Sequence, residues 1–175
     1  MTQLKALLLM MGLALYAPAT IQAQHGTSLI SEVVTSIQQK APEWTLVDIL
    51  EQTYCPQLEN PSEFGKFDYV FQHWRSSESE LSIMYFISDT PEDAIKLFKG
   101  EKLSASSTTT LHPRTFLKGS VVNLGDENFL WRIKGYPTNF GVTFRKKRVV
   151  ISIEAKTLDT AKQFALLITD ALPTK

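Results

Sequence analysis

The sequence predicts an α+β protein, with an antiparallel sheet of about six strands and helices packed on it. Two patterns of apolar residues lead to this prediction. In several short segments apolar and polar residues alternate, as in strands with one buried face, and in others apolar residues recur every three or four positions, as in amphipathic helices. Strand pairs followed by a helix occur in both halves of the chain, which is typical of an antiparallel sheet with helices on one or both faces.

Length and composition agree with one globular domain. The chain has 175 residues, of which 43% are hydrophobic and 21% are charged. These values are ordinary for a globular domain. We expect residues 1–23 to be a signal peptide and residues 24–175 to form a single α+β domain.

The first residues have the features of a secretory signal peptide. Lys5 precedes an apolar run over residues 6–16, and Pro18 follows among small residues. The run is too short to span a bilayer comfortably. Cleavage after Ala19 or after Ala23 fits the pattern, and no cysteine lies near either site to carry a lipid anchor. We therefore expect an exported protein, periplasmic or extracellular, with no transmembrane segment after cleavage.

Two helices are predicted before the first strands. From Ser28 to Gln39 apolar residues recur every four positions, with Ser28 as the helix cap. After a break at Pro42, the segment Trp44–Tyr54 carries a second apolar set that predicts another helix. Prolines at positions 56 and 61 then predict a loop, because proline removes a backbone donor and disfavours the helical region for the preceding residue.

A strand pair and a third helix follow. The segments Phe67–Trp74 and Glu80–Ser88 are rich in aromatic and β-branched residues and are separated by a polar turn. Asp89-Thr90-Pro91 then provides a capping side chain and a proline for the first turn of a helix. We expect this helix to cover residues 91 to about 99 and to end at Gly100.

The middle of the chain predicts a loop and two more strands. Residues Ser104–Thr110 are mostly Ser and Thr and are expected to form a loop. Residues Thr115–Asn123 and Phe129–Ile133 are expected to be strands, divided by a turn at Gly125-Asp126.

The C-terminal segment has the clearest pattern. Apolar residues alternate over 140–144 and again over 149–154, so a β-hairpin with one buried face is expected. Beyond it the period changes to three or four residues, which predicts a helix capped by Thr157 and stopped by Pro173. The apolar face of this helix consists of Leu158, Ala161, Phe164, Ala165, Ile168, Ala171 and Leu172.

The two halves of the chain suggest a duplicated strand–strand–helix unit. In each half, two strands precede a helix with a threonine cap and an alanine four residues later, at Thr90 and Ala94 and at Thr157 and Ala161. Shared secondary structure alone could produce the same similarity, so duplication and coincidence both stay open.

Cys55 is the only cysteine of the chain. Exported domains of this size are often held together by paired cysteines, and a single cysteine excludes a disulfide within the chain. Three roles remain for Cys55: a buried and unreactive side chain, an intermolecular disulfide, and a catalytic thiol. The thiol has the least support, because no base is placed near Cys55 in the sequence.

The charged residues argue against a nucleic-acid partner and indicate one basic surface. Removal of residues 1–23 takes away one lysine and no acid, so 17 basic residues face 18 acidic ones and the net charge is −1. This value does not favour nucleic-acid binding. Four positive charges nevertheless gather at the predicted hairpin tip, where they could bind an anionic surface or only discourage the aggregation of strand edges. They belong to Arg145, Lys146, Lys147 and Arg148.

No motif of the sequence assigns a catalytic residue, a metal or a cofactor. Asp126-Glu127 lacks the further oxygen ligands that a cation requires, so a turn is the simpler interpretation. His73-Trp74-Arg75 is an aromatic and basic cluster on a predicted strand, for which half-buried packing is favoured over catalysis. Phosphate-binding loops, nucleophile elbows and zinc-ligand spacings do not occur.

One stretch of the chain resembles known proteins. Residues Val121–Leu172 contain Leu124-Gly125-Asp126-Glu127, strands around Val142–Arg145 and Val149–Glu154, and the closing helix. Together they look like the C-terminal half of many small exported bacterial proteins of unknown function. The pattern is also loosely similar to α/β/α sandwich proteins of the PsbP and Mog1 type. The resemblance implies helices on both faces of a sheet, and it carries no catalytic residue over to this chain.

These observations lead to an expected function and two alternatives. We expect a non-enzymatic binding or interaction module of the cell envelope, which binds an unknown protein or small-molecule partner through the sheet face or the loop Ser104–Thr110. The first alternative is a small exported hydrolase whose site is assembled from residues distant in sequence. The second is a module that associates with anionic surfaces through Arg145–Arg148.

Overall fold

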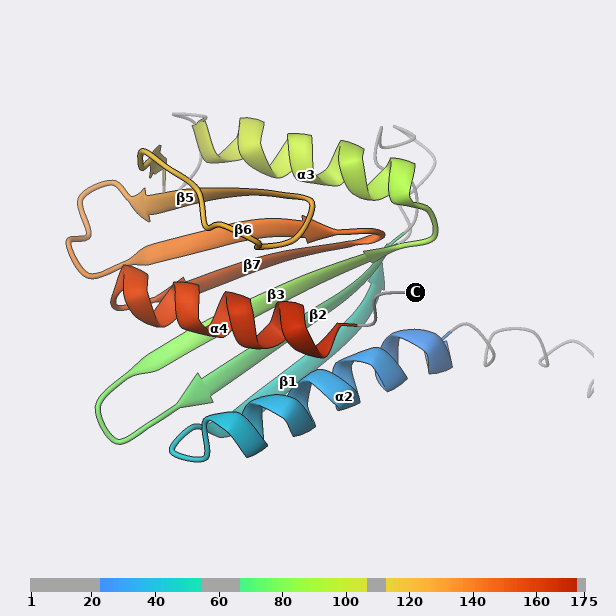
Figure 1. The fold of residues 1–175 in the computed structure, drawn as a ribbon. Coiled ribbons are helices and arrows are strands. Elements are labelled where there is room, and N and C mark those ends of the chain that lie inside the picture. Colours follow the sequence, from blue (N-terminus) through green and yellow to red (C-terminus); the bar gives the residue numbers. More distant parts are fainter. Residues whose placement is uncertain (1–22, 55–66, 107–112, 173–175) are drawn as a thin grey trace, which may run out of the picture.

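Seven strands of the described residues form one antiparallel sheet, in the order β1-β2-β3-β7-β6-β5-β4. The computed structural model describes residues 23–54, 67–106 and 113–172 (Figure 1). Its elements are α2 (Ala23–Lys40), β1 (Thr45–Tyr54), β2 (Phe67–Arg75), β3 (Glu80–Ser88), α3 (Pro91–Ser106), β4 (Arg114–Phe116), β5 (Glu127–Ile133), β6 (Phe140–Lys146), β7 (Val149–Ala155) and α4 (Leu158–Ala171). The predicted α+β class is confirmed, with seven strands where about six were expected.

Helices lie on both faces of the sheet. α2 and α4 pack together over one face, and α3 packs over the other, mainly against the half that contains β5, β6 and β7. Side chains alternate between the faces along each strand, so in β7 Ile151 and Ile153 join the core under α4 while Val150 joins the core under α3. Figure 1 shows α2 and α4 in front of the strands and α3 along the top of the view.

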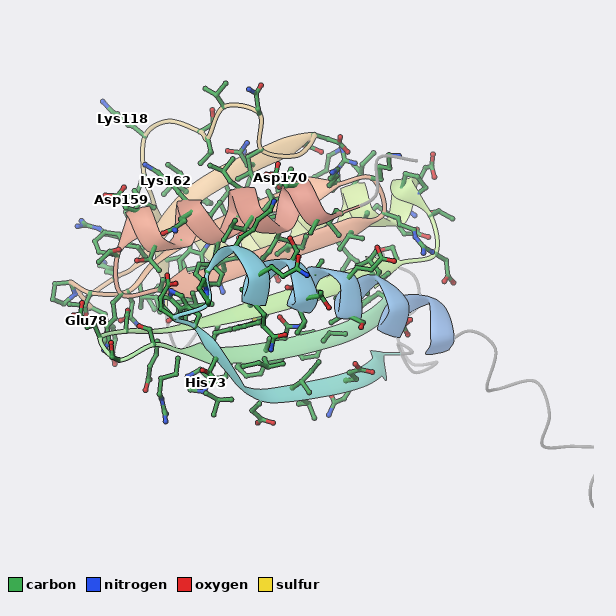
Figure 2. All side chains as sticks on the ribbon, turned by 60° about the horizontal axis from the view of Figure 1, so that its bottom comes forward. His73, Glu78, Lys118, Asp159, Lys162 and Asp170 are labelled. Atoms are coloured by element: carbon green, nitrogen blue, oxygen red, sulfur yellow. The ribbon has the colours of Figure 1, made fainter. Side chains whose placement is uncertain are left out.

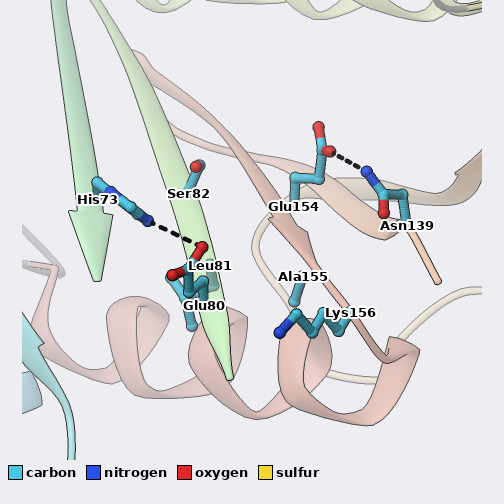
Figure 3. Close-up of a pocket in the computed structure, with 8 residues that line it drawn as sticks. All are labelled: His73, Glu80, Leu81, Ser82, Asn139, Glu154, Ala155 and Lys156. Carbon is cyan, nitrogen blue, oxygen red and sulfur yellow. Dashed lines mark hydrogen bonds and ion pairs between the residues drawn. The ribbon is translucent and has the colours of Figure 1, made fainter. Parts of the chain in front are cut away.

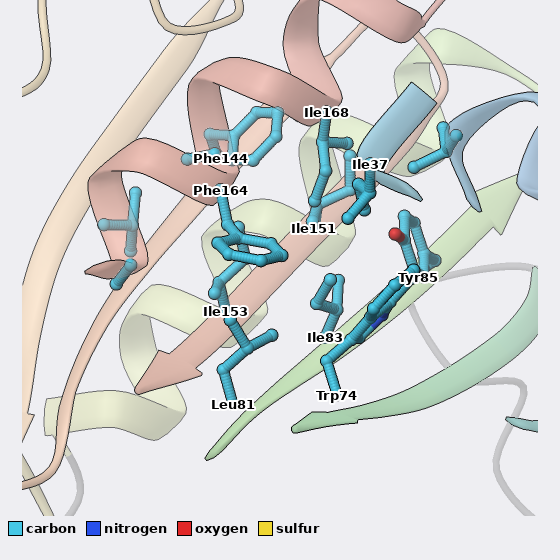
Figure 4. Close-up of a cluster of buried hydrophobic side chains, with 14 of the residues drawn as sticks. Ile37, Trp74, Leu81, Ile83, Tyr85, Phe144, Ile151, Ile153, Phe164 and Ile168 are labelled. Carbon is cyan, nitrogen blue, oxygen red and sulfur yellow. The ribbon is translucent and has the colours of Figure 1, made fainter. Parts of the chain in front are cut away.

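The larger core lies between the sheet and the layer of α2 and α4 (Figure 4). Trp74, Tyr85 and Phe164 are among its bulkiest members, and none of them is exposed. Burial of an aliphatic or aromatic side chain contributes on the order of 1.5–3 kcal/mol to folding, so this cluster is a main source of stability. Its fully buried isoleucines are Ile30, Ile37, Ile83, Ile151, Ile153 and Ile168.

The C-terminal hairpin and helix lie where they were predicted, but the prediction of a single buried face for the hairpin was wrong. Both faces of β6 and β7 are buried, because α3 packs on the face opposite α4. The Thr157 hydroxyl accepts the backbone N–H of Thr160 at 3.1 Å, which satisfies one of the free donors at the start of α4. At the other end the N–H of Leu172 donates to the carbonyl of Ile168. Within the described residues, no helix combines the length and the apolar composition that crossing a membrane would need.

The segment after Trp44 is a strand, so the prediction of a helix over Trp44–Tyr54 was wrong. The apolar residues there fit a helical period but fall on both faces of a strand, and the segment is rich in residues that favour strands. Pairing with β2 decides the outcome, because it gives the backbone of β1 hydrogen-bond partners over almost its whole length. The ladder is interrupted once, by a bulge at Val47 between Leu46 and Asp48.

The third helix continues to Ser106, so the prediction that it ends at Gly100 was also wrong. A glycine inside a helix costs only about 1 kcal/mol relative to alanine. That cost is offset by burial on both sides of Gly100, since Ala94, Phe98 and Ala105 all join the core under α3. Residues 104–106 of the predicted loop therefore belong to α3, and residues 107–110 lie outside the described residues.

The start of α3 matches the prediction from Asp89-Thr90-Pro91. The Thr90 hydroxyl accepts the backbone N–H of Asp93 at 3.1 Å and donates to the Asp93 carboxylate at 2.9 Å. Hydrogen bonds from Thr90 and Lys96 lower the pKa of this exposed carboxyl group. The contacts of the cap therefore favour the ionised form of the Asp93 carboxyl group.

The predicted strand Thr115–Asn123 is mostly a loop, because β4 ends at Phe116. The side chain of Asn128 takes the place of a neighbouring strand. Its Oδ1 accepts the N–H of Val121 at 2.8 Å, and its Nδ2 donates to the carbonyls of Val121 and Leu124, both at 3.0 Å. The Asn128 amide thus provides hydrogen-bond partners for backbone groups of the loop that no neighbouring strand pairs with.

The strand–strand–helix order occurs twice, as β2-β3-α3 and as β6-β7-α4. The two strand pairs meet at the centre of the sheet, where β3 pairs with β7. The helices of the two units lie on opposite faces of the sheet. A twofold axis perpendicular to the sheet, between β3 and β7, would instead place both helices on the same face. Duplication of the unit stays a prediction.

Candidate functional site

Among the described residues, the sheet face that carries α3 is covered by a helix on one half only. α3 packs over β3 to β7 and leaves most of β1 and β2 without a helix on that side. Five apolar residues, three of them aromatic, are exposed or half-buried there, and in β2 and β3 they alternate with buried residues along the strand. We call Leu50, Tyr69, Phe71, Met84 and Phe86 the open aromatic face; Leu50 is 46% exposed and the others are half-buried.

A polar row crosses the same face at one end of these strands. Asp48 pairs with His73 across β1 and β2, His73 with Ser82 across β2 and β3, and Ser82 with Glu154 across β3 and β7. Side chains directly opposite one another on neighbouring strands have Cβ atoms about 4.5–5.5 Å apart. The register of the sheet therefore places an acid, a histidine, a hydroxyl and a second acid side by side.

Part of this row lines a shallow cavity of about 190 Å³ (Figure 3). His73 Nε2 lies 3.8 Å from Glu80 Oε2, and Arg75 Nε lies 3.0 Å from Glu80 Oε1. On the other side of the cavity, Asn139 Nδ2 donates to Glu154 Oε1 at 2.9 Å. The polar side chains around the cavity, which we call the polar cavity, are His73, Glu80, Ser82, Asn139, Glu154 and Lys156.

The polar cavity is better suited to binding than to acyl transfer. An acid, a histidine and a serine are the components of a nucleophilic site, but no hydrogen bond joins Ser82 to His73 in the described part of the chain. β3 lies between β2 and β7, so its backbone N–H groups are engaged in two ladders and none is free to stabilise an oxyanion. The cavity offers charges of both signs and hydrogen-bond donors, which suit a polar ligand group.

Tyr69 connects the open aromatic face to α3. Its ring lies 5.4 Å from that of Phe86. Partial burial, and secondarily the negative charge of Glu101 on α3, raise the pKa of Tyr69 above its ordinary value of 10.0. Because the neutral phenol is favoured in the folded state, this contribution to stability is complete below pH 10 and is lost as the pH rises through the folded pKa.

Replacing Glu101 with glutamine is expected to lower the pKa of Tyr69, since the burial remains and the nearby charge is gone. Phenolate absorbance during an alkaline titration measures the change, and Tyr69→Phe identifies the signal. Glu92→Gln, at the exposed start of the same helix, should leave the titration unaltered. An unchanged Tyr69 pKa in Glu101→Gln would contradict the placement of Glu101 beside this face.

Two of the four charges of the predicted basic tip are engaged within the molecule. Arg145 is 9% exposed, and it donates to Asp126 at 2.7 Å, to Glu127 at 3.0 Å and to the carbonyl of Lys147 at 3.0 Å. Lys146 Nζ donates to the carbonyls of Thr169 and Leu172, at the C-terminal end of α4. The Lys147 backbone N–H also donates to Asp126, and Arg148 is half-buried.

These contacts give Arg145 and Lys146 structural roles. Lys146 places a positive charge at the negative end of the helix dipole, where it satisfies two carbonyls that lack partners within the helix. Asp126 and Glu127, considered above as a weak metal site, are the ion-pair partners of Arg145. Among the described residues, no group of three or more His, Cys, Asp or Glu side chains is placed to hold a metal ion.

Trp74, of the predicted aromatic and basic cluster, faces the other way from its neighbours. It is fully buried under α4, and its indole N–H donates to Gln72 Oε1 at 3.0 Å, which also accepts the Tyr85 hydroxyl at 3.1 Å. His73 and Arg75 lie on the opposite side of the strand, beside the polar cavity. Half-buried packing is thus observed for His73, whose side chain is 27% exposed.

Sequence patterns did not identify the polar row, because its members come from four strands. Only the His73–Ser82 pair could have been found, since the tight turn between β2 and β3 fixes their register. Asp48 was placed in the wrongly predicted helix, and Glu154 depends on a pairing between distant strands. Cys55 and its predicted roles lie outside the described residues.

Comparisons with known proteins do not assign a family. No family model matches the chain, and no curated protein matches it. Among solved structures, a GTP-binding regulator from Thermotoga maritima is similar, with 9% sequence identity, a TM-score of 0.48, and coverage of 81% of this chain and 85% of that one. The extracellular domain of PknH from Mycobacterium tuberculosis is similar with 13% identity, a TM-score of 0.47, and coverage of 80% and 89%. Values this low identify neither a family nor a function.

Proposed function

We propose that the mature chain is an exported, non-enzymatic binding module of the cell envelope, and that it binds a small ligand on the open aromatic face. The observation that carries the proposal is the half-covered sheet face, where aromatic side chains lead to the polar cavity. Binding sites commonly combine an apolar lining with a few polar groups that orient the ligand. A molecule with an apolar body and a polar head fits this arrangement.

Export is the part of the proposal that rests on the sequence alone. The run after Lys5 and the small residues before Ala19 and Ala23 support it. Cleavage after Ala23 would remove only the first residue of α2. Membership of the α/β/α group of the PsbP and Mog1 type is likewise proposed, and helices on both faces of the sheet are compatible with it.

Native mass spectrometry of the protein purified gently from an exporting host tests the proposal. We expect the mass of a chain that begins at Thr20 or Gln24, plus the mass of a bound molecule. The bound molecule should be lost from Phe71→Ser combined with Met84→Ser, and it should be kept by the matched control Leu166→Ser, which changes an exposed residue of α4. A full-length chain would refute export, and a bare mass or a ligand kept by both variants would refute the site.

The enzyme alternative is favoured only by the neighbouring acid, histidine and serine of the polar row. A panel of esters and amides offered to the mature protein separates it from the binding proposal. Hydrolysis that disappears in both Ser82→Ala and His73→Ala would establish an enzyme. The binding proposal expects no turnover above that of the two variants.

A further inference from the structure

The sheet has one long edge that is free within the described residues. β1 is the outermost strand and has ten residues, whereas the opposite edge strand, β4, has three. In an antiparallel pair, every second residue of an edge strand directs its N–H and C=O away from its neighbour. β1 therefore presents a row of backbone donors and acceptors. Figure 2 shows β1 along the border of the molecule, with side chains directed outward.

In the described part of the chain, this edge has little of the usual protection against pairing. Natural edge strands are kept short or carry lysine or proline, and β1 contains neither residue. Val47, Ile49 and Leu50 are 48%, 41% and 46% exposed. The bulge at Val47 is the one irregularity of the strand, and it leaves the segment from Asp48 to Tyr54 in regular register with β2. An exposed apolar edge of this length is typical of a strand that receives another strand.

The charges of β1 determine which kind of strand can pair with its free edge. Asp48 and Glu51 are both exposed, and the strand has no basic residue. They are three positions apart and so lie on opposite faces, Asp48 beside His73 and Glu51 beside Val70. No ion pair holds either acid in the described part of the chain. Pairing of β1 with a second copy would gather four acids on one shared edge without a base, which is unfavourable.

We infer that the β1 edge binds an extended segment of a partner protein, in which two adjacent apolar residues are flanked by basic ones, as an eighth strand of the sheet. The basic residues lie opposite Asp48 and Glu51, one on each face. The two apolar residues lie opposite Ile49 and Leu50, again one on each face. The edge shares Leu50 with the open aromatic face, but no residue of β1 lines the polar cavity, and backbone pairing along the edge requires no ligand there.

A short synthetic peptide with the core Lys-Val-Val-Lys, added to the mature protein, tests the inference. We expect saturable binding by calorimetry, with slower amide exchange and shifted amide NMR signals across Val47–Gln52. N-methylation of the peptide at alternate residues distinguishes a strand from loose association, because only one of its edges faces β1. Methylation of that edge should abolish binding, and methylation of the other edge should leave it intact. Binding that survives methylation of either edge equally, or no binding of the unmethylated peptide, would overturn the inference.

Charge reversal tests the proposed chemistry of the partner. Asp48→Lys combined with Glu51→Lys should weaken binding of the lysine peptide roughly tenfold or more and confer binding of the matching Glu-Val-Val-Glu peptide. The control Glu78→Lys changes the same kind of charge in the exposed turn between β2 and β3, and it should bind as the original protein does. Circular dichroism verifies that each variant is folded. Equal affinity of the original protein for both peptides, or a stable dimer that excludes them, would refute the inference.

Discussion

Replacement of Gly141 with alanine is expected to destabilise the protein by about 3 kcal/mol or more, and replacement with valine is expected to prevent folding. Gly141 lies opposite Trp131 on β5, and a Cβ atom at Gly141 would overlap the indole ring. The ring has no room to move. It is fully buried, its N–H donates to Thr143 Oγ1 at 2.9 Å, and the Arg114 guanidinium lies 4.1 Å from the ring centroid.

Urea denaturation of the mature protein measures this effect, and a double-mutant cycle identifies its cause. Trp131→Leu alone should be destabilising, because it removes a buried aromatic ring. In the Gly141→Ala background the same change should cost much less, since it also relieves the overlap. If the two substitutions have additive effects on the free energy of unfolding, the destabilisation by Gly141→Ala has another origin.

Replacement of Phe164 with alanine is expected to lower the free energy of unfolding by about 3–5 kcal/mol. Phe164 is fully buried on α4 and joins three parts of the fold. Its ring centroid lies 4.9 Å from that of Trp44, just after α2, and 6.5 Å from that of Trp74 in the sheet. The cavity left by the ring would border all three elements, so local repacking would fill little of it.

The control for Phe164→Ala is Leu166→Ala, because Leu166 lies on the same helix and is 40% exposed. It should change stability by about 0.5 kcal/mol or less. Amide exchange in α2 should also accelerate in Phe164→Ala, since α2 is packed mainly against α4. A loss below about 1 kcal/mol for Phe164→Ala would contradict the central position of this residue in the core.

Local patterns predicted the elements whose burial follows a single period. The alternation over 140–144 and 149–154 became β6 and β7, and the helical period after Thr157 became α4 with its cap. These predictions succeeded because the spacing of the apolar residues records the face that α4 buries and the face that β6 and β7 bury under it. The alternation did not indicate that β6 and β7 are buried on their other face as well.

The errors occurred where partners outweighed local preference. The exposed apolar residues of β1 follow no burial pattern, so only its pairing with β2 shows that the segment is a strand. Gly100 is a frequent helix terminator, yet the burial of Ala105 against the sheet extends α3 beyond it. In both cases the deciding energy comes from residues distant in sequence.

The candidate site depended almost entirely on tertiary structure. Its polar row joins Asp48, His73, Ser82 and Glu154 across three strand pairings. The basic tip shows the opposite case, since four adjacent charges are visible in the sequence but the burial of Arg145 and its ion pairs are not.

The sequence by itself determined the α+β class, the C-terminal hairpin and helix, and the start of α3, because periodicity and helix caps are local properties of the chain. Only the tertiary structure decided which half of the sheet α3 covers, which strand is left at the edge, and which polar side chains meet. These features depend on strand order and register. Strand order and register are set by the packing of whole faces against one another, which no short segment of the sequence records.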